Sequence, residues 1–314
     1  MTNVNLSIDI GSLQLKNPIM PASGTFAEQM CEVVNINRLG AIVTKTITKD
    51  LREGNPPPRI AEFADAALFS IGIPSKGLEH YVNKTVPFYK DYTPPLIASI
   101  SADSVEEFGE LAALISVPGV AAIEANISCP NLKKDGQAFG VEAKTTYDVI
   151  QAMVKATSLP IWAKLTPNAA NIVDTALAAE EAGAEALIVA NAILGMAIDP
   201  DTFLPKVANV TGGLTGPALK PILLRMTHQC SKAVSIPIIG CGGISTAYDV
   251  IEYLLAGASA VQIGTANFIS PHAMIRALDQ LEEFCENRSL TNVSQLTGAM
   301  RTHQPLQFNN VNTF

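Results

Sequence analysis

One short stretch places three side chains of complementary chemistry close together in the sequence. It runs Asn126-Ile127-Ser128-Cys129-Pro130-Asn131 and overlaps the end of a mostly apolar run, 121–127. A strand that ends here would present Asn126, Cys129 and Asn131 to one ligand. A carboxamide both donates and accepts hydrogen bonds, and a thiol can transfer a proton. The combination suits a flat, amide-rich ring that loses or gains hydrogen.

The Cys129 thiol has two candidate roles. A free cysteine has a pKa of about 8.5 and is partly ionised near neutrality, so it can act as a base. A nucleophilic thiol, as in a hydrolase, needs a partner histidine and an oxyanion hole. The histidines fall in connections, in helices or in the tail, and not at expected strand ends: His80, His228, His272 and His303. We therefore predict proton transfer by Cys129 and no histidine metal site.

Two lysines stand inside apolar runs and need partners there. Lys45 belongs to Ile42-Val43-Thr44-Lys45-Thr46, and Lys164 belongs to Ile161-Trp162-Ala163-Lys164-Leu165. A buried ammonium group requires an anionic or strongly accepting neighbour. One interpretation is a structural ion pair for each lysine. The other is an anionic cofactor such as a flavin, whose N1–O2 edge gains negative charge on reduction.

The elements that must position these side chains alternate along the chain. Eight short, largely apolar runs are typical of parallel strands that are buried on both faces: 18–21, 41–46, 96–100, 122–127, 161–165, 186–190, 236–240 and 260–263. Helical patterns with polar caps fill most of the intervals. The expected helix starts are Asp103 or Ser104, Thr145 or Thr146, Asn171, Ser245 or Thr246, and Ser270-Pro271.

Eight strand–helix units predict an α/β fold, a (β/α)8 barrel. The alternative is a doubly wound open sheet, which carries its glycine-rich phosphate loop after the first strand. Here the first strand is followed by Ala22-Ser23-Gly24-Thr25, whereas glycine-rich turns follow the last two strands, at Gly240-Cys241-Gly242-Gly243 and Gly264-Thr265. Barrels often bind phosphate at those two loops, so the position of the glycines favours the barrel.

Two connections, about 47–95 and 191–235, are too long for a single helix. Long insertions at the catalytic face of a barrel commonly form substrate pockets or partner surfaces. No linker, repeat or low-complexity stretch interrupts the pattern. We therefore expect residues 1–314 to form one cofactor-binding barrel domain with long loops at its C-terminal face.

Composition excludes several classes of protein. The 314 residues are 48% hydrophobic and 16% charged, and a net charge of −8 argues against a nucleic-acid partner. The first residues lack a signal-peptide pattern, and no apolar run approaches the roughly 18 residues of a spanning helix. Five cysteines without a close pair predict reduced thiols rather than disulfides or zinc ligands. We expect a cytoplasmic protein with no membrane contact and no metal.

Several longer motifs, taken together, resemble those of the class 1 dihydroorotate dehydrogenases, most closely subclass 1B. The resemblance covers about 10–284. Its motifs are Pro21-Ala22-Ser23-Gly24-Thr25-Phe26, Gly54-Asn55-Pro56-Pro57-Pro58-Arg59, the Asn126–Asn131 stretch, Lys164-Leu165-Thr166-Pro167-Asn168, the run 209–218 around Gly212-Gly213-Leu214-Thr215-Gly216-Pro217, Gly242-Gly243, and Gly264-Thr265-Ala266-Asn267-Phe268. The proline-rich element and the cysteine base favour subclass 1B over the membrane-bound class, which uses serine.

The resemblance implies a flavin enzyme that oxidises dihydroorotate to orotate in pyrimidine biosynthesis. Cys129 would take a proton from C5 while hydride passes from C6 to flavin N5. FMN would be bound by Ser23, Lys45, Thr46, Ser99, Asn126, Lys164, Ala190, Gly216, Gly242, Gly243, Gly264 and Thr265. The substrate would contact Lys45, Phe69, Ser70, Ile71, Gly72, Ile73, Asn126, Asn131, Asn191 and Ala192. The resemblance also implies a homodimer and a partner subunit that carries FAD and an iron–sulfur cluster.

Four positions depart from the family pattern. Phe69, Ser75 and Ser99 stand where the family has asparagine, and Ala192 replaces the threonine or serine that usually follows Asn191. Each lost hydrogen bond to a buried polar substrate group costs about 1–3 kcal/mol. The sequence is compatible with a compensated enzyme that still oxidises dihydroorotate, with a paralogue that acts on a related cyclic amide or pyrimidine-like ring, and with a flavin-binding protein without turnover.

Overall fold

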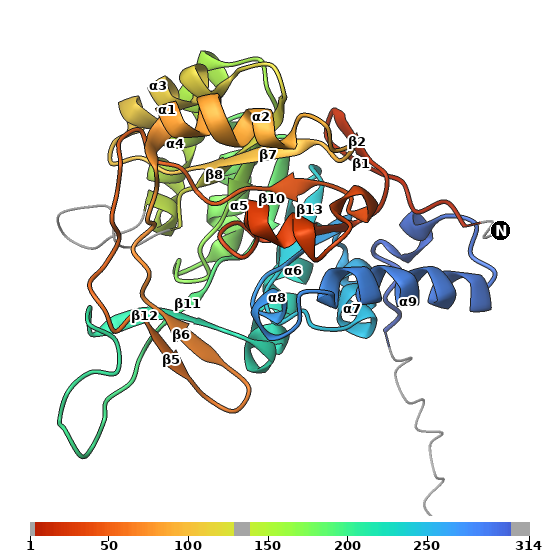
Figure 1. The fold of residues 1–314 in the computed structure, drawn as a ribbon. Helices are drawn as coiled ribbons and strands as arrows, with labels where there is room; N and C mark the ends of the chain where they lie inside the picture. Colours follow the sequence, from red (N-terminus) through yellow and green to blue (C-terminus); the bar gives the residue numbers. More distant parts are fainter. Residues whose placement is uncertain (1–3, 129–138, 303–314) are drawn as a thin grey trace, which may run out of the picture.

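The core of the molecule is an eight-stranded parallel sheet that curls into a nearly closed barrel with helices around it (Figure 1). The structure, a computed structural model, describes residues 4–128 and 139–302. Neighbouring strands follow the order β3-β14-β13-β10-β9-β8-β7-β4. Their bounds are β3 Ile19–Pro21, β4 Ile42–Val43, β7 Leu96–Ile100, β8 Val120–Asn126, β9 Ile161–Lys164, β10 Ala186–Val189, β13 Ile238–Cys241 and β14 Ala260–Ile263. All eight expected strands are confirmed, and so is the (β/α)8 barrel.

The strands are apolar because both of their faces are covered. Nearly every strand residue is buried, with the barrel interior on one side and the helix layer on the other. Between β3 and β4 the Gly40 N–H donates to the Ile19 carbonyl oxygen at 2.8 Å, and a Cβ on Gly40 would lie 2.0 Å from the Asn17 carbonyl oxygen. This close approach draws the first and second barrel strands together.

The helices begin largely where the sequence indicates. The longer ones are α3 Val105–Ile115, α4 Ala143–Ala156, α5 Ile172–Glu181, α6 Lys220–Ala233, α7 Ala247–Ala256 and α9 Ala273–Asn287. The shorter ones are α1 Gly77–His80, α2 Val86–Tyr89 and α8 Ala266–Ile269, with the π-helical turn η3 Tyr81–Thr85 between α1 and α2. The side chains of Ser104, Asn171 and Thr246 cap α3, α5 and α7 as expected.

Two expected helix starts are wrong. Helix α4 begins at Ala143, and the Thr145 and Thr146 hydroxyls donate to backbone carbonyl oxygens instead of capping it. Helix α9 begins at Ala273, and its N-cap is His272, which makes no side-chain cap bond. In both cases a short turn precedes the helix, and before α9 the Ala273 N–H donates to the Ser270 carbonyl oxygen at 2.9 Å.

The two long connections form a second, smaller sheet. Four short antiparallel strands pair in the order β11-β12-β6-β5, with bounds β5 Ile60–Glu62, β6 Ala67–Phe69, β11 Ile193–Met196 and β12 Thr211–Thr215. Strand β11 starts four residues after β10 ends, so this sheet stands at the C-terminal end of the barrel, set off from the barrel strands in Figure 1. We call it the roof sheet. The long connections lie at the face where we expected them, but they contain strands that the sequence did not predict.

The remaining short elements lie outside these two sheets. The hairpin β1 Ile8–Ile10 and β2 Leu13–Leu15 precedes the first barrel strand, and short 3₁₀ helices are η1 Glu28–Glu32, η2 Ile36–Arg38, η4 Phe139–Val141, η5 Pro217–Leu219 and η6 Val293–Leu296. Within the described ranges, the longest helices fall short of the length and apolar content needed to cross a membrane.

Candidate active site

A cavity of about 910 Å³ lies between the C-terminal ends of the barrel strands and the roof sheet. Cofactor and substrate pockets typically occupy about 300–1,000 Å³, and barrel enzymes place them at this end. The cavity is lined by sixteen of the residues expected from the sequence: Ser23, Lys45, Phe69, Ile71, Gly72, Ile73, Asn126, Lys164, Ala190, Asn191, Ala192, Gly216, Gly242, Gly243, Gly264 and Thr265. Segments from the first to the last barrel strand therefore meet at one place.

Three expected residues that the structure describes do not line this cavity. Thr46, Ser70 and Ser99 are buried behind its wall. Asn55 donates from its Nδ2 to the Ser70 carbonyl oxygen and hydroxyl, so Ser70 supports the roof from within. Cys129 and Asn131 lie outside the described residues.

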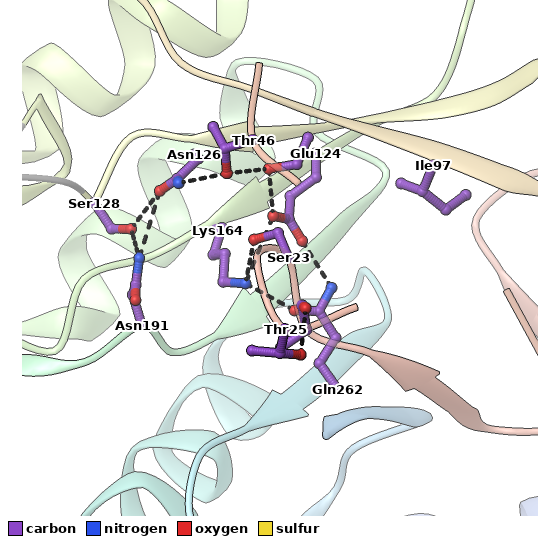
Figure 2. Close-up of polar contacts among 12 residues, drawn as sticks. Ser23, Thr25, Thr46, Ile97, Glu124, Asn126, Ser128, Lys164, Asn191 and Gln262 are labelled. Atoms are coloured by element: carbon purple, nitrogen blue, oxygen red, sulfur yellow. Dashed lines mark hydrogen bonds and ion pairs between the residues drawn. The ribbon is translucent and has the colours of Figure 1, made fainter. Parts of the chain in front are cut away.

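The Lys164 ammonium group is held on the cavity floor by three partners. It donates to Gln262 Oε1 at 2.9 Å and to Ser23 Oγ at 3.1 Å, and it lies 3.5 Å from Glu124 Oε1 (Figure 2). The side chains of Lys164 and Glu124 are 4% and 0% exposed. Lys164 therefore has the structural ion pair considered above and also faces the cavity, so the two interpretations of this lysine are compatible.

Glu124 and Gln262 are the residues that the sequence interpretation missed. Both sit in apolar strand runs, Val120–Asn126 and Ala260–Ile263. A buried carboxylate within an apolar strand costs free energy unless it is paired. The presence of Glu124 in such a strand could therefore have indicated a buried cation as its partner, and Lys164 is a buried cation in another strand.

A hydrogen-bonded chain connects this ion pair to the carboxamide cluster, and Figure 2 labels Glu124, Thr46 and Asn126 along it. Ser99 Oγ donates to Glu124 Oε1 at 2.8 Å and lies 2.9 Å from Thr46 Oγ1. Asn126 Nδ2 donates to Thr46 Oγ1 at 3.1 Å. The buried hydroxyls of Thr46 and Ser99 therefore fix the orientation of the Asn126 amide from behind the cavity wall.

On the cavity side, Asn126 is joined to two further polar groups. Its Oδ1 accepts hydrogen bonds from Ser128 Oγ at 2.8 Å and from Asn191 Nδ2 at 3.4 Å. Asn191 Oδ1 in turn accepts from the Ala192 N–H at 2.8 Å. These side chains belong to β8 and to the end of β10, so two strand ends present pre-oriented carboxamides to one ligand.

The glycine turns at the other end of the cavity permit close backbone packing. A Cβ on Gly243 would lie 2.7 Å from the Lys220 backbone nitrogen, and one on Gly216 would lie 2.8 Å from Ala66 Cα. The Gly242 carbonyl oxygen accepts a hydrogen bond from the buried Tyr253 hydroxyl at 2.7 Å. The N-terminus of α6 lies beside these turns, and a helix N-terminus favours anions.

The roof sheet gives the cavity an apolar wall. Phe69 lies 5.9 Å from Phe268 between ring centroids, and both side chains line the cavity. Ala192 faces Gly213 so closely that a Cβ on that glycine would lie 2.6 Å from the alanine methyl. Of the four departures from the family pattern, Phe69 and Ala192 therefore border the cavity.

The other two departures are used structurally. The Ser75 hydroxyl accepts hydrogen bonds from the backbone N–H groups of Thr48 and Gly77, and it does not line the cavity. Ser99 supports Glu124, as described above. Serine at these two positions alters the layer behind the cavity wall rather than its surface.

The four described cysteines are thiols rather than thiolates near neutral pH. Burial raises the pKa of Cys31, Cys241 and Cys285, and it raises the pKa of Cys230 to about 12. Cys241 borders the cavity at the end of β13. No histidine borders the described part of the cavity, and within the same residues no cluster of His, Cys, Asp or Glu could hold a metal ion. Among the described residues that line the cavity there is therefore no nucleophile–histidine pair for acyl transfer.

The described residues fit a flavin on two grounds. The glycine turns line the cavity beside the N-terminus of α6, an arrangement that favours anions, and the Lys164 ammonium also borders the cavity. Lys45 also borders the cavity, where a Cβ on Gly24 would lie 3.4 Å from its Nζ. A helix N-terminus at the first place and ammonium groups at the second suit a ligand with a phosphate and an electron-rich ring edge.

Comparison with known proteins gives one consistent family. The profile of the family described as dihydroorotate dehydrogenase matches residues 5–285. The chain is 45% identical over 304 residues to dihydroorotate dehydrogenase B (NAD(+)), catalytic subunit, of Geobacter metallireducens, covering 96% of this chain and 100% of that protein. Proteins of the same name match from Thermoanaerobacter sp., 41% identical (95% and 99% covered), and Bacteroides fragilis, 44% identical (94% and 99% covered).

Gly216→Ala should disturb the contact between the roof sheet and the glycine turns. Gly216 has φ of 116°, and an added Cβ would meet the backbone of Asp65 and Ala66, so we expect a loss of roughly 2–4 kcal/mol in the free energy of unfolding. Gly298→Ala is the matched control, because its φ is 70° but nothing lies within 4 Å of the added atom. Denaturant unfolding measures both, and equal losses would contradict the packing role of Gly216.

Proposed function

We infer the reaction from the family of the protein. The profile match and the 45% identity show that the chain belongs to the dihydroorotate dehydrogenase family. It is a flavin-dependent oxidoreductase that acts on a CH–CH group, and the reaction is oxidation of dihydroorotate to orotate in pyrimidine biosynthesis. The observation that carries this proposal is the cavity itself, which is lined by glycine turns beside a helix N-terminus, by a pair of oriented carboxamides and by a buried ammonium.

FMN is the flavin that we propose, bound within one barrel domain that spans the chain. Gly216, Gly242, Gly243, Gly264 and Thr265 would hold its phosphate end. Ser23, Lys45, Asn126, Lys164 and Ala190 would hold its ring, with Thr46 and Ser99 behind them. When bound, the flavin supplies the acceptor for the hydride that leaves the substrate.

The chain's own residues orient the substrate and move its proton. Asn126 and Asn191 are joined by the hydrogen bond from Asn191 Nδ2 to Asn126 Oδ1, and together with Lys45 and Asn131 they would hold the pyrimidine ring and its carboxylate. Lys45, Asn126 and Asn191 border the described cavity. Cys129 would take the proton from substrate C5. The apolar wall at Phe69 and at 71–73 would exclude water from the reacting carbon atoms.

Partner subunits follow from the names of the relatives. Those relatives are called catalytic subunits of an NAD(+)-dependent enzyme, and subclass 1B resemblance implies a separate electron-transfer subunit with FAD and an iron–sulfur cluster. We propose that this chain works with such a subunit, as a homodimer in the cytoplasm. Co-purification and mass measurement test this assembly.

A second candidate, oxidation or reduction of a different cyclic amide or pyrimidine-like ring, rests on Phe69 and Ala192. Both border the cavity and neither side chain can hydrogen-bond to a substrate. A ring with fewer polar substituents than dihydroorotate would suit this wall better.

An anaerobic titration tests the proposed reaction. The purified protein should be yellow, and dihydroorotate should bleach its flavin absorbance stoichiometrically. A protein that binds FMN but keeps its colour with dihydroorotate would overturn the dihydroorotate assignment. A protein that cannot take up FMN would overturn the flavin assignment as well.

Cys129→Ser should separate proton transfer from flavin binding. A serine hydroxyl is far less ionised than a thiol near neutral pH, so it supplies much less of the basic anion. General acid–base catalysis contributes about 10²–10⁴-fold, so flavin reduction by dihydroorotate should slow by roughly that factor. Flavin content should stay at the wild-type level. Stopped-flow absorbance measures the rate, and an unchanged rate would remove Cys129 from the mechanism.

Phe69→Asn distinguishes the two candidate substrates. If a less polar ring is the substrate, the added carboxamide should raise kcat/KM for dihydroorotate about tenfold, because one hydrogen bond contributes about 1–3 kcal/mol. If dihydroorotate is the substrate, the variant should lose activity, because the packing of Phe69 on Phe268 is lost. Steady-state kinetics with dihydroorotate and with unsubstituted cyclic amides provide the comparison.

A further inference from the structure

The stability of the fold does not by itself explain the ion pair between Glu124 and Lys164. Buried pairs are seldom more stabilising than apolar residues of the same volume, because removing both charges from water is costly. This pair stands inside the barrel, directly beneath a cavity, with side chains that are almost wholly buried. Its position therefore calls for a role in the site above it.

Both oxygens of Glu124 are occupied by donors. Ser99 Oγ donates to Oε1 at 2.8 Å, and Gln262 Nε2 donates to Oε2 at 2.7 Å. A carboxylate in its ionised form only accepts hydrogen bonds, so its two oxygens match these two donors. The carboxylate also lies 3.5 Å from the Lys164 ammonium, so these groups hold it in one position.

Gln262 links the two charges a second time. Its Oε1 accepts from Lys164 at 2.9 Å while its Nε2 donates to Glu124. The amide therefore bridges the ammonium and the carboxylate, and together with Ser23 it fixes the ammonium at the cavity floor. In a site of low dielectric, charges held in this way act strongly on any charge that develops nearby.

We propose that Glu124 is a positioning residue of the flavin site, which holds the Lys164 ammonium in place and limits how strongly that ammonium favours the reduced flavin. The inference rests on the flavin binding proposed above. A reduced flavin carries more negative charge than an oxidised one, so the ammonium stabilises it and the nearby carboxylate opposes that stabilisation. Glu124 thereby keeps the reduction potential low enough for electrons to leave the flavin again.

The test is the reduction potential of FMN bound to Glu124→Gln, measured anaerobically against a reference dye. The amide keeps the volume of the side chain and can still accept from Ser99, but it removes the negative charge. We expect the equilibrium to shift at least tenfold toward reduced flavin, which for a two-electron couple is about 30 mV upward. The measurement uses no dihydroorotate, so it can fail or succeed whatever the substrate is.

A charge-swapped double variant keeps the test decisive. Glu124→Gln with Gln262→Glu moves the carboxylate from β8 to β14, where it faces the same ammonium through the mirrored hydrogen bonds. It should return the equilibrium to within about threefold of the wild type. Glu110→Gln is the surface control, because that exposed carboxylate pairs with Lys49, and it should leave the potential unchanged.

Two results would overturn the proposal. One is a Glu124→Gln variant that retains FMN with the wild-type potential. The other applies where Glu124→Gln alone does not retain FMN, so that the double variant decides. If the double variant also fails to retain FMN, or if its equilibrium between oxidised and reduced flavin lies more than tenfold from that of the wild type, the carboxylate does not act by compensating Lys164. A swapped variant with the wild-type potential would support the proposal on its own.

Discussion

The burial of Lys164 and Glu124 together inside the barrel determines how the side chains on the cavity floor are arranged. Neither charge is tolerated there alone, since an uncompensated buried charge costs several kcal/mol. Lys164 therefore requires Glu124, Gln262 and Ser23, and Glu124 requires Ser99 as well. The same chain of donors and acceptors reaches Asn126 through Thr46, so one buried pair fixes both the ammonium and the carboxamide that face the cavity.

The barrel could be predicted from the sequence because its strands have a simple pattern. Parallel strands covered on both faces are continuous apolar runs, and caps such as Ser104 and Thr246 follow local rules. The roof sheet could not, because its strands pair across the two long connections, as β6 does with β12. Such pairing depends on tertiary contacts rather than on local pattern.

The lining of the cavity was predictable at the strand ends, and the residues behind the lining were less so. Asn126, Lys164 and the glycine turns were identifiable as lining residues because polar residues at the ends of apolar strands converge in a barrel. Glu124 and Gln262 were missed because no local rule links residues 138 positions apart, and only the closed barrel brings them within 2.7 Å. The expected base, Cys129, lies outside the described residues, so its role still rests on the sequence.

The central claim is that a flavin and a pyrimidine share the cavity above Lys164. A crystal structure with FMN and orotate tests it most directly. We expect the phosphate at the backbone of Gly243 and Thr265, the flavin ring beside Lys164, and the orotate amides on Asn126 and Asn191. A flavin phosphate bound away from the glycine turns, or an orotate that does not contact these two asparagines, would contradict the account.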